Sequence, residues 1–389
     1  MDIISGLILV PVVGGSLYAL LCIWASWRFF SSKLEERYGP MPPATVLKPC
    51  YGIDRDMKAN LESLIDQDYP EHQDYPEIQV ILSVQRLDDP CIPILEEMKS
   101  KWPDRVDIVI APSKPTLNGK VQNMIGALPH VRHELIVISD SDARAGPGYL
   151  RHMLTPLQDP EVGYVCSLYR VADYESVADA LELLSINTDF VPSILFAYVT
   201  GASSFCLGAS TALQLRDLNA IGGLESLADY LVEDYEMGRR LRALGKKAVL
   251  IPDMVDLSTD YANIKSWYEH MVYWDQNTCA ANRIGFFLTI LTRAIPFAIL
   301  YALIAPTDPI HLGIAAIAIL TRLGSAAVIA GLFLQNKASL KALPYLPLRD
   351  CLGLFSWIQA QLRGSFTWRG VRFGLTREGR IYTLSSDRD

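Results

Sequence analysis

Two carboxylates spaced two residues apart, Asp140 and Asp142, have the residue type and the spacing of a metal-binding pair. They follow residues 135–138, Leu-Ile-Val-Ile, a pattern typical of a strand buried on both faces of a parallel sheet. Such sheets bind ligands at the carboxyl ends of their strands. Two carboxylates there can share one hard divalent cation, which can also hold a diphosphate. Taken alone, the same pair is equally typical of a surface turn.

Other ionisable residues stand where an expected element begins or ends. Asp88 and Asp89 follow an apolar run over 78–84, although both are also common turn-formers before a proline. Lys120 follows Asn118-Gly119, itself a turn signal, and is either a ligand-binding lysine or an exposed lysine at a helix start.

A second acidic pair, Glu233-Asp234, lies in the second half of the chain. A carboxylate placed beside a hydroxyl can remove its proton as a general base. The alternative is an acidic helix face, paired with Arg239 and Arg240 at helical spacing. Both interpretations hold together if one carboxylate points into a cleft.

Short strands that alternate with helices must position these residues. The pattern predicts an α/β domain with a doubly wound sheet. We expect strands over 45–48, 78–84, 106–111 and 135–139, and helices over 55–67 and 120–128.

Composition narrows the class of protein. The 389 residues are 50% hydrophobic, and the mean hydropathy of +0.18 is high for a soluble enzyme. A formal net charge of −8 argues against a nucleic-acid partner. The seven cysteines show no paired spacing, which favours reduced thiols in a cytosol-facing domain over a disulfide framework or a zinc site.

Apolar segments at both ends predict an integral membrane protein. Residues 3–30, 286–305 and 310–334 are each long enough to cross a bilayer, whereas 351–362 is about half that length and predicts an interfacial or re-entrant helix. Basic residues after positions 30 and 334 place those ends, and the domain between the spans, in the cytoplasm. Arg293 and Arg322 interrupt the later spans, so each must face protein, water or a lipid phosphate.

We therefore expect four regions. They are an N-terminal transmembrane helix (1–30), a linker (31–44), a cytosolic domain (45–283) and a C-terminal membrane region with a basic tail (284–389). Within the domain, residues 182–198 are strongly apolar. They predict either a core helix interrupted by Pro192 or an amphipathic interfacial element that lines a lipid entrance.

Several separated strings together resemble one family, the membrane glycosyltransferases related to ceramide glucosyltransferase. Lys48-Pro49-Cys50-Tyr51-Gly52-Ile53-Asp54 resembles its KPxxGxD string, and Asp140-Ser141-Asp142-Ala143-Arg144 its DSxxR string. The other resembling strings are Val84-Gln85-Arg86-Leu87-Asp88-Asp89-Pro90, Asn118-Gly119-Lys120-Val121-Gln122-Asn123, Thr200-Gly201, Gly208-Ala209-Ser210, Gly222-Gly223-Leu224, Val232-Glu233-Asp234-Tyr235 and Trp368-Arg369-Gly370-Val371-Arg372-Phe373. They occur in the family's order from residue 46 to about residue 380.

The resemblance implies a GT-A fold, with a doubly wound mixed sheet, in a membrane-anchored protein. It implies an inverting transfer of a single sugar, expected to be glucose, from a UDP-sugar to the hydroxyl of a membrane lipid such as ceramide. The cofactor expected from it is Mg²⁺ or Mn²⁺.

The resemblance also implies roles for individual residues. Asp140 and Asp142 would hold the metal ion, and Asp234 would be the catalytic base. The donor would bind at Pro49, Asp88, Lys120 and Asp140, with Asp88 recognising the uracil base. Glu233 would lie near the acceptor or the diphosphate.

One string departs from the family's pattern. The family carries (Q/R)xxRW after the base, whereas this chain has His270, Tyr273 and Trp274 at the first, fourth and fifth positions. A neutral phenol cannot replace the bidentate phosphate contact of a guanidinium. His270, Arg283 or Arg293 could supply the missing contact, or the donor or acceptor differs from that of the ceramide enzymes.

Alternative functions remain open at this point. One is transfer to a different lipid, such as diacylglycerol or a hopanoid. Another is a polysaccharide synthase, although Tyr273 and the small number of spans argue against it. The non-enzymatic alternative is a lipid-binding scaffold on a decayed transferase fold.

Overall fold

The computed structural model describes residues 3–32, 42–67, 78–110, 116–202, 206–362, 365–368, 371–376 and 379–384. Most of the expected linker, together with Arg363, Arg369 and Arg377 of the basic tail, lies outside these ranges. By its internal contacts the chain divides into two units. The helical unit comprises Met1–Lys33, Val171–Ser203 and Thr259–Gly374, and the sheet unit comprises Leu34–Arg170, Ser204–Ser258 and Leu375–Asp389.

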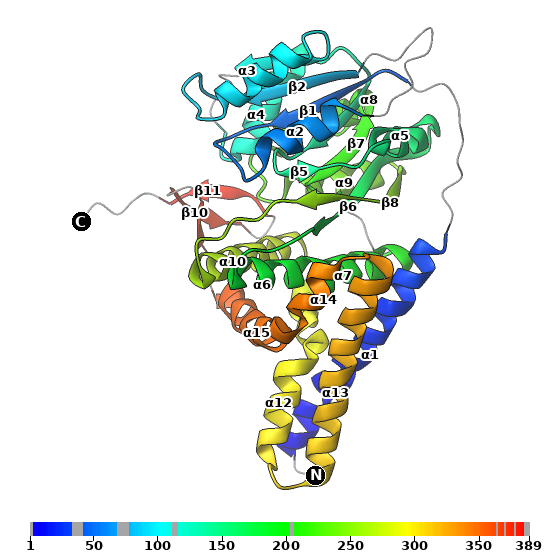
Figure 1. Cartoon of the computed structure of the whole chain (residues 1–389), viewed down its shortest axis with the longest axis vertical. Coiled ribbons are helices and arrows are strands. Elements are labelled where there is room, and N and C mark those ends of the chain that lie inside the picture. The colour runs from blue at the N-terminus through cyan, green and yellow to red at the C-terminus, as the bar shows by residue number, and fades with distance from the viewer. Residues whose placement is uncertain are drawn as a thin grey trace, which may run out of the picture. The chain divides into compact units, whose positions relative to one another are not determined.

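The sheet unit is built on an eight-stranded sheet with the order β3-β2-β1-β4-β7-β6-β8-β5 (Figure 1). Strands β1 to β4 pair in parallel, whereas β7 is antiparallel to both β4 and β6. The sheet is therefore mixed, as expected for the GT-A fold. The strands are β1 (Ala44–Pro49), β2 (Ile78–Val84), β3 (Val106–Ile110), β4 (Leu135–Ser139), β5 (Ala143–Arg144), β6 (Val162–Val171), β7 (Ser210–Gln214) and β8 (Lys247–Leu257).

Helices connect these strands, and two of them lie close to the expected ranges. Helix α2 is slightly shorter than expected, and α4 begins one residue early because the Asn118 side chain caps it. The helical segments of this unit are α2 (Met57–Ile65), α3 (Ile92–Lys101), α4 (Gly119–Ala127), η1 (Leu128–His130), α5 (Tyr149–Leu154), η2 (Thr155–Gln158), α8 (Leu215–Ala220), η4 (Leu224–Leu227) and α9 (Glu233–Ala243). A short strand, β11 (Ile381–Thr383), completes it.

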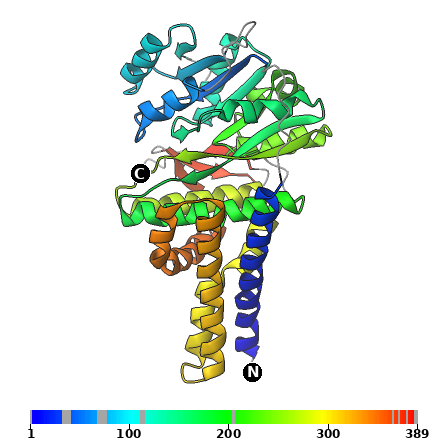
Figure 2. The ribbon, with the colours of Figure 1, turned by 45° about the vertical axis from the view of Figure 1, so that its right-hand side comes forward.

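The helical unit contains long apolar helices that lie side by side. Figures 1 and 2 show α1, α12 and α13 running together, with α6, α7 and α10 lying across this direction. The elements are α1 (Ile3–Phe30), α6 (Val177–Ser185), η3 (Ile186–Phe190), α7 (Val191–Val199), α10 (Ile264–Ala281), α11 (Arg283–Leu288), η5 (Thr289–Thr292), α12 (Ala294–Ile304), α13 (Pro309–Val328), η6 (Ile329–Phe333), α14 (Lys337–Ala342), η7 (Leu343–Tyr345), α15 (Leu346–Leu362), β9 (Ser365–Trp368) and β10 (Val371–Leu375).

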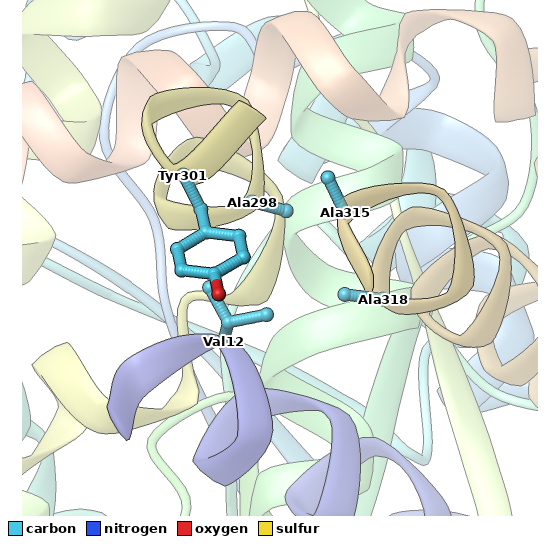
Figure 3. Packing of buried hydrophobic residues seen from close by; sticks show 5 residues of the cluster. All are labelled: Val12, Ala298, Tyr301, Ala315 and Ala318. Carbon is cyan, nitrogen blue, oxygen red and sulfur yellow. The ribbon is translucent and has the colours of Figure 1, made fainter. Parts of the chain in front are cut away.

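Small residues bring the long helices together. Val12, Ala298, Tyr301, Ala315 and Ala318 form a buried cluster between α1, α12 and α13 (Figure 3). At Gly15 a side chain would stand 2.7 Å from the backbone nitrogen of Ala294, so α1 and α12 approach closely only because this residue is glycine.

Among the described residues, three helical stretches have the length and the hydropathy of a membrane span: Ile3–Phe30, Val177–Val199 and Pro309–Phe333. A fourth candidate, Arg283–Thr292 with Ala294–Ile304, is bent by 50° at Arg293. The stretch Val177–Val199 lies across the other spans and is largely buried within the unit, which favours an interfacial position.

Pro192 does not interrupt this apolar stretch. It stands in the first turn of α7, directly after a π-helical turn over Ile186–Phe190. Proline has no N–H to donate to the carbonyl four residues earlier, so the carbonyl of Thr188 is released from the helix ladder. That carbonyl accepts a hydrogen bond from Arg322 instead.

Candidate active site

The turn after β4 carries the two aspartates that opened the sequence analysis. The backbone N–H of Asp140 donates to Ala209 at 3.0 Å, and the N–H of Ala143 returns to the carbonyl of Asp140 at 3.2 Å. The N–H of Ser258 donates to the carbonyl of Asp142 at 3.3 Å. Two segments far apart in the sequence, together with a hydrogen bond within the turn, therefore fix its backbone.

Lys48 supports the turn from beneath. It is the penultimate residue of β1, its side chain is fully buried, and its Nζ donates to the carbonyls of Asp140 at 2.8 Å and Ala143 at 3.3 Å. Burial lowers the pKa of Lys48 to about 8, although the nearby carboxylates act in the opposite direction. The sequence analysis did not assign a role to this residue.

Asp142 stands among other carboxylates. Burial, then repulsion from Asp140 and Asp54, raises the pKa of its carboxyl group to about 7. Asp54 is held close to the turn because Oγ of Ser141 donates to its Oδ2 at 2.5 Å. The Oδ1 atom of Asp142 is buried and has no hydrogen-bond partner among the residues that the structure describes.

These features fit a bound cation. A metal ion would occupy the unsatisfied oxygen of Asp142 and remove the repulsion between Asp142 and Asp140. Among the residues that the structure describes, no group of three or more His, Cys, Asp or Glu side chains could hold a metal ion. Any ion held by the two aspartates therefore needs further ligands from water or from a bound phosphate.

Lys120 connects this turn to the second acidic pair. Its Nζ lies 2.6 Å from Oδ1 of Asp140 and 3.5 Å from Oε1 of Glu233, and donates to the carbonyl of Gly208 at 3.0 Å. Burial alone would lower the pKa of Lys120, but Asp140 and Glu233 outweigh burial and raise it above the usual range. The ammonium is therefore charged at neutral pH.

Asn118 orients both Lys120 and Glu233. Its Oδ1 accepts from the backbone N–H groups of Lys120 at 3.1 Å and Val121 at 3.2 Å, which caps α4. Its Nδ2 donates to Oε2 of Glu233 at 3.0 Å. The asparagine of the Asn118-Gly119 turn signal is thus part of the site.

Asp234 lies in the first turn of α9, next to Gly208. Its Oδ1 accepts from the N–H of Tyr235 at 2.7 Å, while Oδ2 points toward Gly208, where a Cβ atom would approach to 2.8 Å. Burial, then repulsion from Glu233, raises the pKa of Asp234 to about 7. Lys120, Gly208, Glu233 and Asp234 line one cavity.

The structure does not bring every candidate into this cluster. Asp88 forms a bidentate pair with Arg86, and both side chains are largely exposed. Asp89 instead links two loops, accepting from the N–H groups of Gly52 at 2.9 Å and Cys91 at 3.0 Å. Arg144 donates to Asn60 at 3.0 Å.

Pro49 ends strand β1 beside Lys48, and its backbone is in register with Ser83 of β2. It is only half-buried at the carboxyl edge of the sheet.

The residues of the altered string belong to the helical unit. His270, Tyr273 and Trp274 share one face of α10, and the His270 ring lies 6.4 Å from Tyr273 and 5.9 Å from Trp274. Nε2 of His270 is 3.5 Å from Oε1 of Glu182, whose Oε2 accepts from Trp267 at 2.9 Å.

Lys48, Asp54 and Gly208 were not among the predicted site residues. A lysine at the end of an otherwise apolar strand was a usable signal for Lys48, because an ionised side chain there must have partners. Gly208 belonged to the resembling string Gly208-Ala209-Ser210, but it was given no role, since its importance depends on a side chain from α9.

Comparisons with known proteins bear on this arrangement. A family model described as glycosyl transferase family 21 matches residues 7–381. Ceramide glucosyltransferase 1 of Caenorhabditis elegans is 24% identical over 280 residues, which cover 70% of this chain and 59% of that protein. Ceramide glucosyltransferase of Komagataella phaffii is 30% identical over 166 residues, covering 39% of this chain and 31% of that protein. The chain thus spans less than two thirds of the length of these relatives.

A solved structure supports the fold. The mannosyltransferase of Pyrobaculum calidifontis, determined in complex with GDP-Man and Mn²⁺, aligns with a TM-score of 0.55 at 17% identity and covers 92% of this chain and 98% of that chain. The sheet order, the aspartates after β4 and a family match over nearly the whole length agree, and the chain belongs to glycosyl transferase family 21.

Proposed function

We propose that this protein transfers one sugar, glucose, from UDP-glucose to the hydroxyl group of a membrane lipid such as ceramide, with inversion. The observation that carries the proposal is that Lys120 pairs with Asp140 and Glu233 and interacts electrostatically with Asp142 and Asp234, at the carboxyl end of a parallel strand. The names of the relatives support the choice of sugar and lipid.

Asp140 and Asp142 would hold a divalent cation, Mg²⁺ or Mn²⁺, which would supply positive charge to neutralise the departing diphosphate. Lys120, already charged and paired with Asp140, supplies a second positive group to the donor phosphates. Lys48 keeps the backbone of the aspartate turn in place before the donor arrives.

Asp234 removes the proton from the acceptor hydroxyl as that oxygen attacks the anomeric carbon. A base with a pKa near neutral is both deprotonated and basic enough at physiological pH. Glu233 is fixed by Asn118 and Lys120, so it raises the pKa of Asp234 rather than acting as the base itself. Pro49 and Asp88 remain proposed contacts of the donor nucleotide.

The helical unit supplies the candidate membrane spans, and we propose that the domain over 45–283 faces the cytoplasm. Arg28 lies in the last turn of α1, and Lys337 and Lys341 follow α13, which is the distribution of the positive-inside rule. A soluble donor would then enter from the cytosol, while the lipid acceptor comes from the leaflet.

The proposal is tested by measuring UDP release from the detergent-solubilised full chain with Mn²⁺ or Mg²⁺. A panel of UDP-sugars is combined with ceramide, diacylglycerol or a polyol lipid. We expect release to require UDP-glucose, one lipid and the metal ion together.

An Asp234→Asn variant is the matched control, because it keeps the shape of the side chain and removes the base. Loss of turnover in this variant supports an enzyme with Asp234 as its base. Full activity in the variant contradicts that assignment, and absence of release by folded wild-type protein with every pair contradicts the proposed transfer and favours a lipid-binding scaffold.

A further inference from the structure

The helical unit contains a cavity of about 220 Å³ whose wall carries both apolar and ionisable side chains. Helices α1, α6, α7, α10, α11, α13 and α15 and the turns η3 and η5 contribute to it. Its ionisable lining residues are Glu182, Asp189, Asp275, Arg293, Arg322, Arg349 and Asp350. At about 30 Å³ for each water, the volume equals about seven waters, which suits a polar headgroup but excludes lipid chains.

Arg322 is one of two arginines built into the wall. It comes from the apolar helix α13, yet only 8% of its surface is exposed. Its Nε donates to Oδ2 of Asp350 at 3.0 Å, and its Nη1 donates at 3.1 Å to the Thr188 carbonyl that Pro192 leaves free. An ionisable residue in an apolar span is costly unless it is paired in this way, and such residues commonly mark functional sites.

Arg349 completes the wall. Its Nη1 donates to Oδ1 of Asp350 at 3.0 Å, its Nη2 to Oδ2 of Asp189 at 2.6 Å and its Nε to Ser185 at 3.0 Å. The guanidinium groups of Arg322 and Arg349 are therefore already offset by carboxylates.

Arg293 differs from the other two arginines. It lies at the 50° bend before α12, and its Nε is buried without a hydrogen-bond partner in the described structure. Its charge acts on both Asp189 and Asp275. A buried guanidinium nitrogen without an acceptor, at the wall of a cavity, is a donor available to a ligand.

The charge balance of the wall selects among ligands. Four carboxylates face three arginines, so a phosphate would add negative charge where carboxylates are already in excess. An uncharged group can accept from Arg293 and donate to carboxylates without disturbing this balance. Beside Arg293, the side chains of Phe287, Leu288 and Leu291 are 57%, 51% and 40% exposed and offer apolar surface for lipid chains.

We infer that this cavity binds the uncharged, hydroxyl-bearing headgroup of a membrane lipid, with Arg293 donating to a headgroup oxygen and Asp189 and Asp275 accepting from its hydroxyl or amide hydrogens. The inference deepens the proposed function and rests on it, because the bound lipid is the acceptor. It also gives the protein a means to reject the phospholipids that surround it, since their phosphates meet the excess carboxylates.

The test is equilibrium binding to the full chain in detergent, without nucleotide-sugar, of two fluorescent probes that carry the same label: a short-chain ceramide and a phosphatidic acid. Arg293→Leu removes the donor, and Thr292→Leu narrows the cavity, which Thr292 also lines. Arg28→Leu is the matched control, because Arg28 is exposed near the end of α1 and does not line the cavity. Thermal unfolding confirms that each variant is folded.

We expect the wild type and Arg28→Leu to bind the ceramide probe at least tenfold more tightly than the phosphatidic acid probe. Arg293→Leu and Thr292→Leu should each weaken ceramide binding tenfold or more, and Thr292→Leu decides the matter if Arg293→Leu does not fold. Wild-type ceramide affinity in the folded variants, or equal affinity of the wild type for both probes, would overturn the inference. Binding is measured without sugar transfer, so the expected binding pattern can hold even if the proposed transfer fails. Conversely, if Arg293→Leu transfers sugar with an unchanged KM for the acceptor, the inference about the cavity is rejected while the proposed function stands.

Discussion

Gly208 provides the sharpest test of where the base lies. A methyl group added at this position would stand 2.8 Å from Oδ2 of Asp234 and 3.6 Å from Nζ of Lys120. Only the first of these distances is shorter than an ordinary contact. The substitution Gly208→Ala therefore displaces the proposed base and leaves the lysine where it is.

The size of the effect follows from this distance. To reach an ordinary contact of 3.4 Å, the Asp234 oxygen must withdraw by about 0.6 Å. A misplacement of about 1 Å can cost ~100-fold in rate, so we expect kcat to fall about tenfold to thirtyfold. This loss corresponds to ~1.4–2 kcal/mol in the activation barrier. The folded state should lose little stability, because the displaced atom is the end of a side chain.

The assay is UDP release with the donor, lipid and metal identified by the substrate panel, together with thermal unfolding in the same detergent. Gly146→Ala is the matched control, since Gly146 belongs to the same unit and a side chain there would meet nothing within 4 Å. We expect this control to keep the kcat and the unfolding temperature of the wild type. In Gly208→Ala, kcat should fall while the KM for the donor stays within about twofold, because the phosphate-binding groups do not move.

An unchanged kcat in folded Gly208→Ala would refute the assignment of Asp234 as the base. A higher KM for the donor at unchanged kcat would instead place the crowded carboxylate in substrate binding.

Three further substitutions test other parts of the structure. Asp142→Asn should abolish metal-stimulated turnover while keeping or raising the unfolding temperature, because it relieves repulsion between buried carboxylates; a drop of several degrees would contradict this account. Glu236→Gln should cost ~1–2 kcal/mol of unfolding free energy at pH 7, because two arginines of the same helix hold the pKa of this buried carboxyl below its usual range. With the folded pKa depressed, that contribution is lost as the pH falls below about 4, so the two proteins should converge in acid. Gly15→Leu should lower the unfolding temperature, because the new side chain would clash with Ala294 and separate α1 from α12. Gly313→Leu should leave the unfolding temperature unchanged, because a side chain there would lie more than 4 Å from every described atom outside its own neighbourhood.

Local sequence patterns were sufficient to predict two of the strands that carry the candidate site. Residues 78–84 and 135–139 became β2 and β4 without change, because an apolar run followed by carboxylates can hardly be anything but a buried strand that reaches a sheet edge. Once β1 and β4 pair in parallel, the residues that follow them meet at that edge, which brings Asp54 next to Ser141 and Asp142.

Other features depend on contacts that no local pattern encodes. Lys48 appeared in the sequence analysis only within the string that resembles the family. The pattern of apolar residues in a strand does not show that the ammonium group of this lysine reaches a backbone carbonyl 92 residues away. Arg322 was expected to face protein, water or phosphate, and it faces protein. Its partner Asp350, and the role of Pro192 in freeing an acceptor for it, required the packing of three separate helices.

The division of the chain also has a consequence for biosynthesis. Strands β1 to β4 leave the ribosome before residues 171–203, which belong to the helical unit, and β7 and β8 follow only afterwards. The sheet therefore cannot be completed until an apolar segment of the helical unit has been synthesised, and the last strands of the sheet join only after that segment. A secreted or soluble fragment cut to residues 45–283 would carry α6 and α10 without Tyr345 and Leu352, which cover their shared cluster, and we expect it to aggregate on expression.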